Sequence, residues 1–220
     1  MRYVNDITCD SHMAVMRHCR PGFKEYQMES IFNHWCYFRG GARFMAYTCI
    51  CASGDNGAVL HYGHAGEPNS KTIRDGEMCL FDMGCEYHGY TSDVTCSFPS
   101  SGFFTEQLTL IYEAVLDTQW TVMAAMRPGV SWGSMHELAY RVILTCLKEG
   151  GLLVGDVDEM LANEVGAVFM PHGLGHFMGL DTHDVGGYTA SSPPRSTRPG
   201  FKSLRTQRIL EENMVGPCAQ

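Results

Sequence analysis

Apolar residues recur at helical spacing in four stretches of the chain, and these stretches fall into two pairs. The spacing predicts helices over residues 11–18, 24–38, 105–126 and 134–148. A proline–glycine pair separates the two helices of each pair, Pro21-Gly22 in the first and Pro128-Gly129 in the second. Because proline and glycine interrupt a regular helix, we expect a turn at each of these points.

Shorter apolar runs lie between the two pairs of helices and predict β-strands. The expected strands cover residues 44–51, 58–62, 78–83 and about 87–98. The last two are expected to pair as an antiparallel hairpin. Residues 186–200 are rich in Gly, Ser, Pro and Arg, a composition typical of a loop.

A short internal echo links the two halves of the chain. Arg20-Pro21-Gly22 precedes a helix that contains Met28, and Arg127-Pro128-Gly129 precedes a helix that contains Met135 at the same offset. A match of three residues can also arise by chance. The echo nevertheless indicates a duplicated helix–helix–strand unit whose halves face each other across a central sheet.

Composition and charge indicate which classes of protein fit this sequence. An apolar share of 45% and a charged share of 18% over 220 residues favour a globular fold over disorder. The net charge of −8 argues against nucleic acid as a partner. No apolar stretch approaches the roughly 20 residues that span a bilayer, and the first residues lack the apolar core of a secretory signal. Ten cysteines without a Cys-x-x-Cys pair favour free thiols and a cytoplasmic location.

Two aspartates stand out within the predicted hairpin. Asp82 lies in Phe81-Asp82-Met83-Gly84, and Asp93 lies in Ser92-Asp93-Val94-Thr95. If the register places both on one face, their carboxylates come close together and repel each other unless a cation lies between them. The alternative is that Asp82 makes a turn and Asp93 lies on an exposed strand face.

Several histidines occur on glycine-rich segments. His172 and His176 flank Gly173-Leu174-Gly175, and the spacing of four is that of two metal ligands on a helix, although the glycines and Pro171 disfavour a helix there. Three further histidines, His61, His64 and His183, lie on similar turns, so we expect the group to gather at a cleft. No Gly-x-Ser-x-Gly elbow or phosphate-binding loop is present, and none of the cysteines has a local nucleophile motif.

These motifs resemble the prolidases, the Xaa-Pro dipeptidases among the pita-bread metallopeptidases. The likeness extends from near Tyr3 to about Val215, and six runs carry it: residues 47–51, 58–66, 79–84, 92–99, 166–176 and 183–188. The resemblance implies an α+β fold with two pseudo-symmetric halves around an antiparallel sheet. It also implies that residues 1–220 form a single, C-terminally incomplete metallopeptidase domain without the amino-terminal domain of the family.

The resemblance further implies a chemistry. Such enzymes hold two Mn²⁺ ions with two aspartates, one histidine and two glutamates; the matching positions here are Asp82, Asp93 (bridging) and His176. A hydroxide shared by the metals attacks the peptide bond of a dipeptide that ends in proline. His172 and His183 match residues that bind the substrate and stabilise the tetrahedral intermediate. His61 and Arg205 match groups that receive the terminal carboxylate of the dipeptide, and a homodimer is a further expectation.

The sequence departs from the family after Met214-Val215. The family continues into Thr-Val-Glu-Pro-Gly, whereas this chain reads Gly216-Pro217-Cys218-Ala219-Gln220, so neither glutamate ligand is matched. Glu211 and Glu212 precede the Met-Val landmark and are not expected to substitute. Two hypotheses follow: an Xaa-Pro dipeptidase, or a truncated, catalytically defective prolidase-like protein with a structural or subunit-pairing role. We expect weak Mn²⁺ binding, at fewer than two sites, and an open sheet edge.

Overall fold

The computed structural model describes residues 1–63 and 69–216. The chain divides into two compact units. Unit 1 comprises Met1–Thr105 and Met178–Thr182, and unit 2 comprises Glu106–Phe177 and His183–Gln220. His64 lies outside the described residues. None of the helices in the described ranges combines the length and the apolar character that crossing a bilayer requires.

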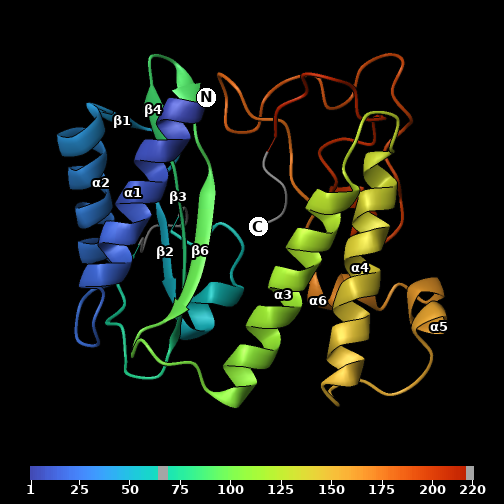
Figure 1. Cartoon of the computed structure of the whole chain (residues 1–220), viewed down its shortest axis with the longest axis horizontal. Helices are drawn as coiled ribbons and strands as arrows, with labels where there is room; N and C mark the ends of the chain where they lie inside the picture. The colour runs from blue at the N-terminus through green and yellow to red at the C-terminus, as the bar shows by residue number, and fades with distance from the viewer. Residues whose placement is uncertain (64–68, 217–220) are drawn as a thin grey trace. The chain divides into compact units, whose positions relative to one another are not determined.

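Unit 1 is built from two helices and two small antiparallel sheets. The helices are α1 (Arg2–His18) and α2 (Glu25–Gly40). The first sheet has the order β2-β3-β6, formed by Ile50–Ser53, Met78–Met83 and Val94–Pro99. The second has the order β1-β4-β5, formed by Phe44–Met45, Cys85–Tyr87 and Tyr90–Thr91. Figure 1 shows both helices beside the strands of this unit. They share one apolar core with β3, in which Met28, Phe32 and Phe81 are fully buried.

The hairpin prediction is confirmed for β3 and corrected for its partner. The expected strand over residues 87–98 is interrupted, because His88 and Gly89 have positive φ angles of 51° and 83° and form a two-residue turn between β4 and β5. Two positive φ angles match the twist of a tight hairpin. Of the expected strand over residues 87–98, the part that pairs with β3 is therefore β6, with Met83 opposite Val94.

The strand expected at residues 58–62 is absent from the described structure. A 3₁₀ turn, η1 (Gly54–Ala58), and a further turn occupy this region, and Val59 and Leu60 are more than half exposed. An apolar run without a neighbouring strand gains no ladder of hydrogen bonds, so the apolar pattern alone was misleading here. The strand expected over 44–51 is likewise divided between β1 and β2.

Unit 2 is mainly helical. Its elements are α3 (Glu106–Ala125), α4 (Trp132–Glu149), α5 (Val157–Ala162), α6 (Gly166–Phe169) and the 3₁₀ turn η2 (Phe201–Ser203). The long helices α3 and α4 lie side by side (Figure 1). A buried cluster that includes Tyr140, Leu144, Leu174 and Leu204 ties α4 to the loops that follow it. Residues 186–200 contain no helix or strand, which confirms the loop prediction.

The internal echo in the sequence is matched by a repeated pattern of backbone hydrogen bonds. In unit 1 the turn before α2 bonds to a following segment through Gly22 N to Ile73 O (2.9 Å), Ile73 N to Phe23 O (2.8 Å) and Glu25 N to Lys71 O (3.0 Å). In unit 2 the turn before α4 makes the same pattern through Gly129 N to Leu210 O (2.8 Å), Leu210 N to Val130 O (2.8 Å) and Trp132 N to Arg208 O (2.9 Å). Each of the three bonds in unit 1 has a counterpart in unit 2 at the corresponding position of the turn and of the following segment. The two halves therefore repeat one motif, and Glu25 corresponds to Trp132.

His136 on α4 makes the stability of unit 2 sensitive to acid. Its fully buried ring packs against Tyr140 and Phe201, and neither ring nitrogen has a hydrogen-bond partner among the described residues. Burial, reinforced by the charges of His172 and Arg198, lowers the pKa of His136 to about 4. The folded chain therefore resists protonation that the unfolded chain accepts below about pH 6.5, and stability falls between about pH 6.5 and pH 4.

We expect His136→Phe to remove this acid sensitivity. From pH 7 to pH 5 the wild-type free energy of unfolding should fall by about 2 kcal/mol more than that of the variant. Urea unfolding of both proteins at the two pH values measures the difference. Equal losses in the two proteins would show that His136 is not the responsible group.

Candidate functional site

Unit 1 brings Asp82 and Asp93 together. Asp82 lies in β3 opposite Thr95 of β6, and Asp93 immediately precedes β6. The hydroxyl of Tyr47 lies 2.5 Å from Oδ1 of Asp82 and 2.9 Å from Oδ1 of Asp93. Asp82 is 6% exposed and Asp93 9% exposed. The alternative in which Asp82 makes a turn and Asp93 lies on an exposed face is therefore wrong.

Burying the carboxylates of Asp82 and Asp93 side by side is electrostatically unfavourable. Burial, followed by the charge of Asp93, raises the pKa of Asp82 to about 7, although a hydrogen bond from Tyr47 opposes the shift. Burial and the two carboxylates also raise the pKa of Tyr47 well above its ordinary value, so its hydroxyl remains a donor. Two buried carboxylates around one phenol favour a shared proton or a bound cation over two free negative charges.

Tyr47 begins the 47–51 run that carries the family resemblance, and no local motif in the sequence predicts a role for it. Tyr47 lies just before β2, whose residue Ile50 pairs with Asp82, and this pairing carries the phenol to the carboxylates. Register between strands that are distant in sequence sets this contact, so no local spacing signals it.

Gly84 allows the segment before Asp93 to pack closely against the end of β3, the strand that contains Asp82. Gly84 follows β3, and a Cβ atom placed on it would overlap the carbonyl oxygen of Ser92, with the Ser92 carbonyl carbon at 2.6 Å and Tyr47 Cε1 at 3.0 Å. The amide of Ser92 also donates to the Cys85 carbonyl at 3.0 Å. Only a residue without a side chain lets the chain before Asp93 lie against the end of β3.

Unit 2 contains the predicted histidine loop. Residues 171–177 follow α6 and are not helical, as the glycines and proline indicated. Trp132 Nε1 donates to the Leu174 carbonyl at 2.6 Å, in the middle of the loop. A Cβ atom on Gly173 would lie 2.6 Å from the Ser203 oxygen and 2.7 Å from Leu204 Cα, so the loop packs directly on a second backbone segment.

The hydrogen bond of His176 determines which ring nitrogen carries the proton. Its Nδ1 lies 2.9 Å from the Phe177 carbonyl, which can only accept, so Nδ1 carries the proton and Nε2 presents the lone pair. His176 is 7% exposed, and its ring lies 4.4 Å, centre to centre, from that of His183. His172 makes the corresponding contact, from Nδ1 to the Gly173 carbonyl at 3.1 Å.

The two residues predicted to receive a carboxylate lie in different units. Arg205 in unit 2 is exposed and follows Leu204, whose carbonyl accepts hydrogen bonds from Arg195 and Tyr188. His61 in unit 1 is also exposed and has a φ angle of 55°, which places its backbone in the left-handed region. Glu211 is exposed and pairs with Arg208 at 2.8 Å.

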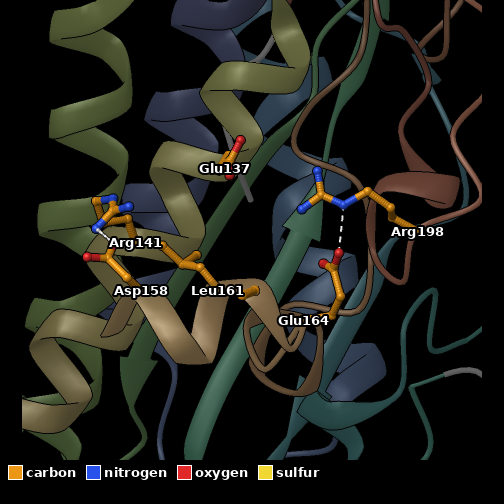
Figure 2. Close-up of a pocket in the computed structure, with 7 residues that line it drawn as sticks. Glu137, Arg141, Asp158, Leu161, Glu164 and Arg198 are labelled. Carbon is orange, nitrogen blue, oxygen red and sulfur yellow. Dashed lines mark hydrogen bonds and ion pairs between the residues drawn. The ribbon is translucent and has the colours of Figure 1, made fainter. Parts of the chain in front are cut away.

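A cavity of about 430 Å³ in unit 2 contains none of these residues. It is lined by Glu137, Arg141, Asp158, Leu161, Ala162, Glu164 and Arg198. Figure 2 shows four of its charged groups in two pairs: Arg141 contacts Asp158 at 2.8 Å, and Arg198 contacts Glu164 at 2.6 Å. The candidate functional residues are therefore the carboxylate pair in unit 1 and the histidine loop in unit 2.

The chemistry of the donors fits a divalent cation. Carboxylates and a neutral imidazole are ordinary ligands of Mn²⁺ and Zn²⁺, and a cation would relieve the repulsion between Asp82 and Asp93. The described residues show no group of three or more His, Cys, Asp and Glu side chains gathered to hold a metal ion. Unit 1 shows the carboxylate pair and unit 2 shows the imidazole, and their union in one site is a proposal.

Comparisons with known proteins agree on one family. The model of metallopeptidase family M24 matches residues 1–216. The chain is 59% identical to Xaa-Pro dipeptidase from Mus musculus over 98% of its length and 55% identical to that from Homo sapiens, and it spans 43% of each of these relatives. Among solved structures, zinc-substituted aminopeptidase P from E. coli in complex with product has a TM-score of 0.85 and 39% identity over 98% of this chain and 44% of that one. Aminopeptidase PepP from Pseudomonas aeruginosa also has a TM-score of 0.85, with 37% identity over 97% of this chain and 44% of that one.

Proposed function

The chain belongs to metallopeptidase family M24 and has the α+β pita-bread fold, and on that premise we propose that it carries the metal-binding core of an Xaa-Pro dipeptidase. The proposed reaction is hydrolysis of a dipeptide with proline at its carboxyl end. The observation that carries the proposal is the buried pair formed by Asp82 and Asp93 around Tyr47.

Asp82, Asp93 and Nε2 of His176 would hold the metal, and Asp93 would be the ligand shared between two ions, as the resemblance implies. Divalent cations bound there would polarise the peptide carbonyl and make a water molecule nucleophilic at neutral pH. Tyr47 would orient the two carboxylates through its shared hydroxyl. Mn²⁺ as the ion, a homodimeric state and a cytoplasmic location rest on the resemblance to Xaa-Pro dipeptidases.

The proposed substrate contacts come from four side chains. His172 and His183 would bind the peptide and stabilise the tetrahedral intermediate by donating hydrogen bonds to its developing oxyanion. His61 and Arg205 would receive the terminal carboxylate, because a guanidinium group offers two parallel donors to a carboxylate. The resemblance also includes two glutamate ligands that no residue of this sequence matches.

Incubation of the purified chain with Mn²⁺ and Gly-Pro tests the proposal. Release of proline, with calorimetry that counts the bound ions, is the expected result. An intact fold that binds Mn²⁺ but releases no proline would instead support the catalytically defective alternative. A folded chain that binds no Mn²⁺ would overturn both the metal site and the peptidase function.

A further inference from the structure

The first residue of the second helix in each half anchors a loop that bears the proposed functional histidines. Glu25 is the first residue of α2, and Trp132 is the first residue of α4. The two positions correspond in the internal repeat, since Glu25 N donates to Lys71 O and Trp132 N donates to Arg208 O. Their side chains differ in type, yet each is buried and each bonds to a loop of its own unit.

The carboxylate of Glu25 accepts hydrogen bonds from described residues that lie before and after His61 in the sequence. Glu25 is fully buried. Five donors surround its two oxygens: Ser53 N (2.8 Å), Ser53 Oγ (2.7 Å), Asn56 Nδ2 (3.2 Å), Tyr62 OH (2.8 Å) and Lys71 N (3.2 Å). A buried carboxylate needs such donors, and once they are in place it fixes the segments that supply them.

One of these donors is adjacent to His61. Tyr62 bonds to Glu25, while the backbone of His61 is held at a φ angle of 55°. A left-handed residue with a side chain costs free energy and persists where neighbouring contacts impose it. His61 is exposed, and the residue that follows it is anchored to Glu25.

In unit 2, Trp132 anchors the histidine loop as Glu25 anchors the segment around His61. Its indole is 4% exposed and donates to the Leu174 carbonyl at 2.6 Å, two residues from both His172 and His176. Leu174 is itself buried, and Gly173 lies against the backbone of Ser203 and Leu204. The loop is therefore held from one side by the indole and from the other by a close backbone contact.

We propose that Glu25 and Trp132 are paired positioning residues, with Glu25 acting through Tyr62 to place His61 for the substrate carboxylate and Trp132 placing the loop that carries His172 and His176. This inference rests on the proposed function for the roles of the three histidines. It adds that the first residue of the second helix has the same role in both halves. Glu25 positions the segment that contains His61, and Trp132 positions the loop that contains His172 and His176.

Tyr62→Phe and Trp132→Phe test the proposal, because each removes one donor and retains an aromatic ring. Glu25→Gln is a less suitable test, since a mismatched amide in a buried network can prevent folding. Tyr37→Phe and Trp120→Phe are matched controls, because Tyr37 is 55% exposed and Trp120 is 65% exposed. The readouts are Mn²⁺ affinity by calorimetry, Gly-Pro affinity of the metal-free chain by NMR titration, and the Cε1–Hε1 signals of the histidines in the metal-free chain.

The expected result is a separation of effects. Trp132→Phe should weaken Mn²⁺ binding about tenfold and shift the signals of His172 and His176, with the His61 signal unchanged. Tyr62→Phe should weaken Gly-Pro binding about fivefold to tenfold and shift the His61 signal, with Mn²⁺ affinity unchanged. The controls should change none of these quantities.

Two results would overturn the proposal. One is a loss of stability in both variants without displacement of any histidine signal, which would mean that both residues serve packing alone. The other is that each variant alters both loops. If the wild-type chain binds neither Mn²⁺ nor Gly-Pro, the proposed function fails, while the histidine signals of the metal-free chain still decide whether the two residues position their loops.

Discussion

Gly84→Ala is expected to lower the free energy of unfolding by about 3 kcal/mol or more, although it adds a single methyl group. The new Cβ atom would overlap the carbonyl oxygen of Ser92 and lie 2.6 Å from its carbonyl carbon. These are backbone atoms, and the segment that contains them leads directly into Asp93. Relief of the overlap must therefore separate this segment from the end of β3, which also moves the two carboxylates apart.

Gly57→Ala is the matched control in the same unit. A Cβ atom at Gly57 would meet only Leu80 Cβ, at an ordinary contact distance of 3.7 Å. We expect this variant to lie within about 0.5 kcal/mol of the wild type. Chemical denaturation of the three proteins measures the difference. A Gly84→Ala variant as stable as Gly57→Ala would show that the two segments do not approach as closely as described.

Asp82→Asn is expected to have opposite effects on metal binding and on the stability of the metal-free chain. The amide keeps the shape of the carboxylate and still accepts a hydrogen bond from Tyr47, but it lacks the charge that a cation needs. Mn²⁺ affinity should fall about 100-fold or more, because a charged ligand is lost. Without metal at pH 8, the free energy of unfolding of the variant should equal that of the wild type or exceed it by up to about 1 kcal/mol. The reason is that the substitution removes one of two buried charges that repel each other.

The sign of the stability effect follows from the raised pKa of Asp82. A carboxyl group whose folded pKa lies near 7 costs the folded state free energy as pH rises from about 4 to about 7. Asp75→Asn is the control, since Asp75 is exposed and should change neither quantity. Calorimetry with Mn²⁺ and urea unfolding in a chelating buffer provide the two measurements. If Asp82→Asn weakens the metal-free chain and leaves Mn²⁺ binding intact, the carboxylate is a structural group rather than a ligand.

Local sequence patterns predicted the helical framework well. Apolar spacing and the two proline–glycine turns indicated all four long helices, and the echo between Arg20-Pro21-Gly22 and Arg127-Pro128-Gly129 indicated the repeat. The first helix nevertheless begins at Arg2 rather than Ser11, because Val4 and Ile7 extend its buried face towards the amino terminus. The short helices α5 and α6 were not predicted, since six and four residues are too few to establish a helical period.

Contacts between distant segments were harder to predict. The proximity of Asp82 and Asp93 followed from the expected hairpin, although the strand over residues 87–98 is in fact divided at His88-Gly89. The shared phenol of Tyr47 and the buried carboxylate of Glu25 depend on strand register and on loop closure. Neither has a period or a spacing in the sequence, because their partners lie tens of residues away.

The central proposal is that Asp82, Asp93 and His176 bind one divalent-metal centre. A crystal of the chain grown with Mn²⁺ and measured by anomalous scattering tests it directly. The account predicts manganese peaks bonded to the carboxylates of Asp82 and Asp93 and to Nε2 of His176. Manganese bound elsewhere, or bound to the carboxylates with the His176 imidazole turned away from the ion, would contradict it.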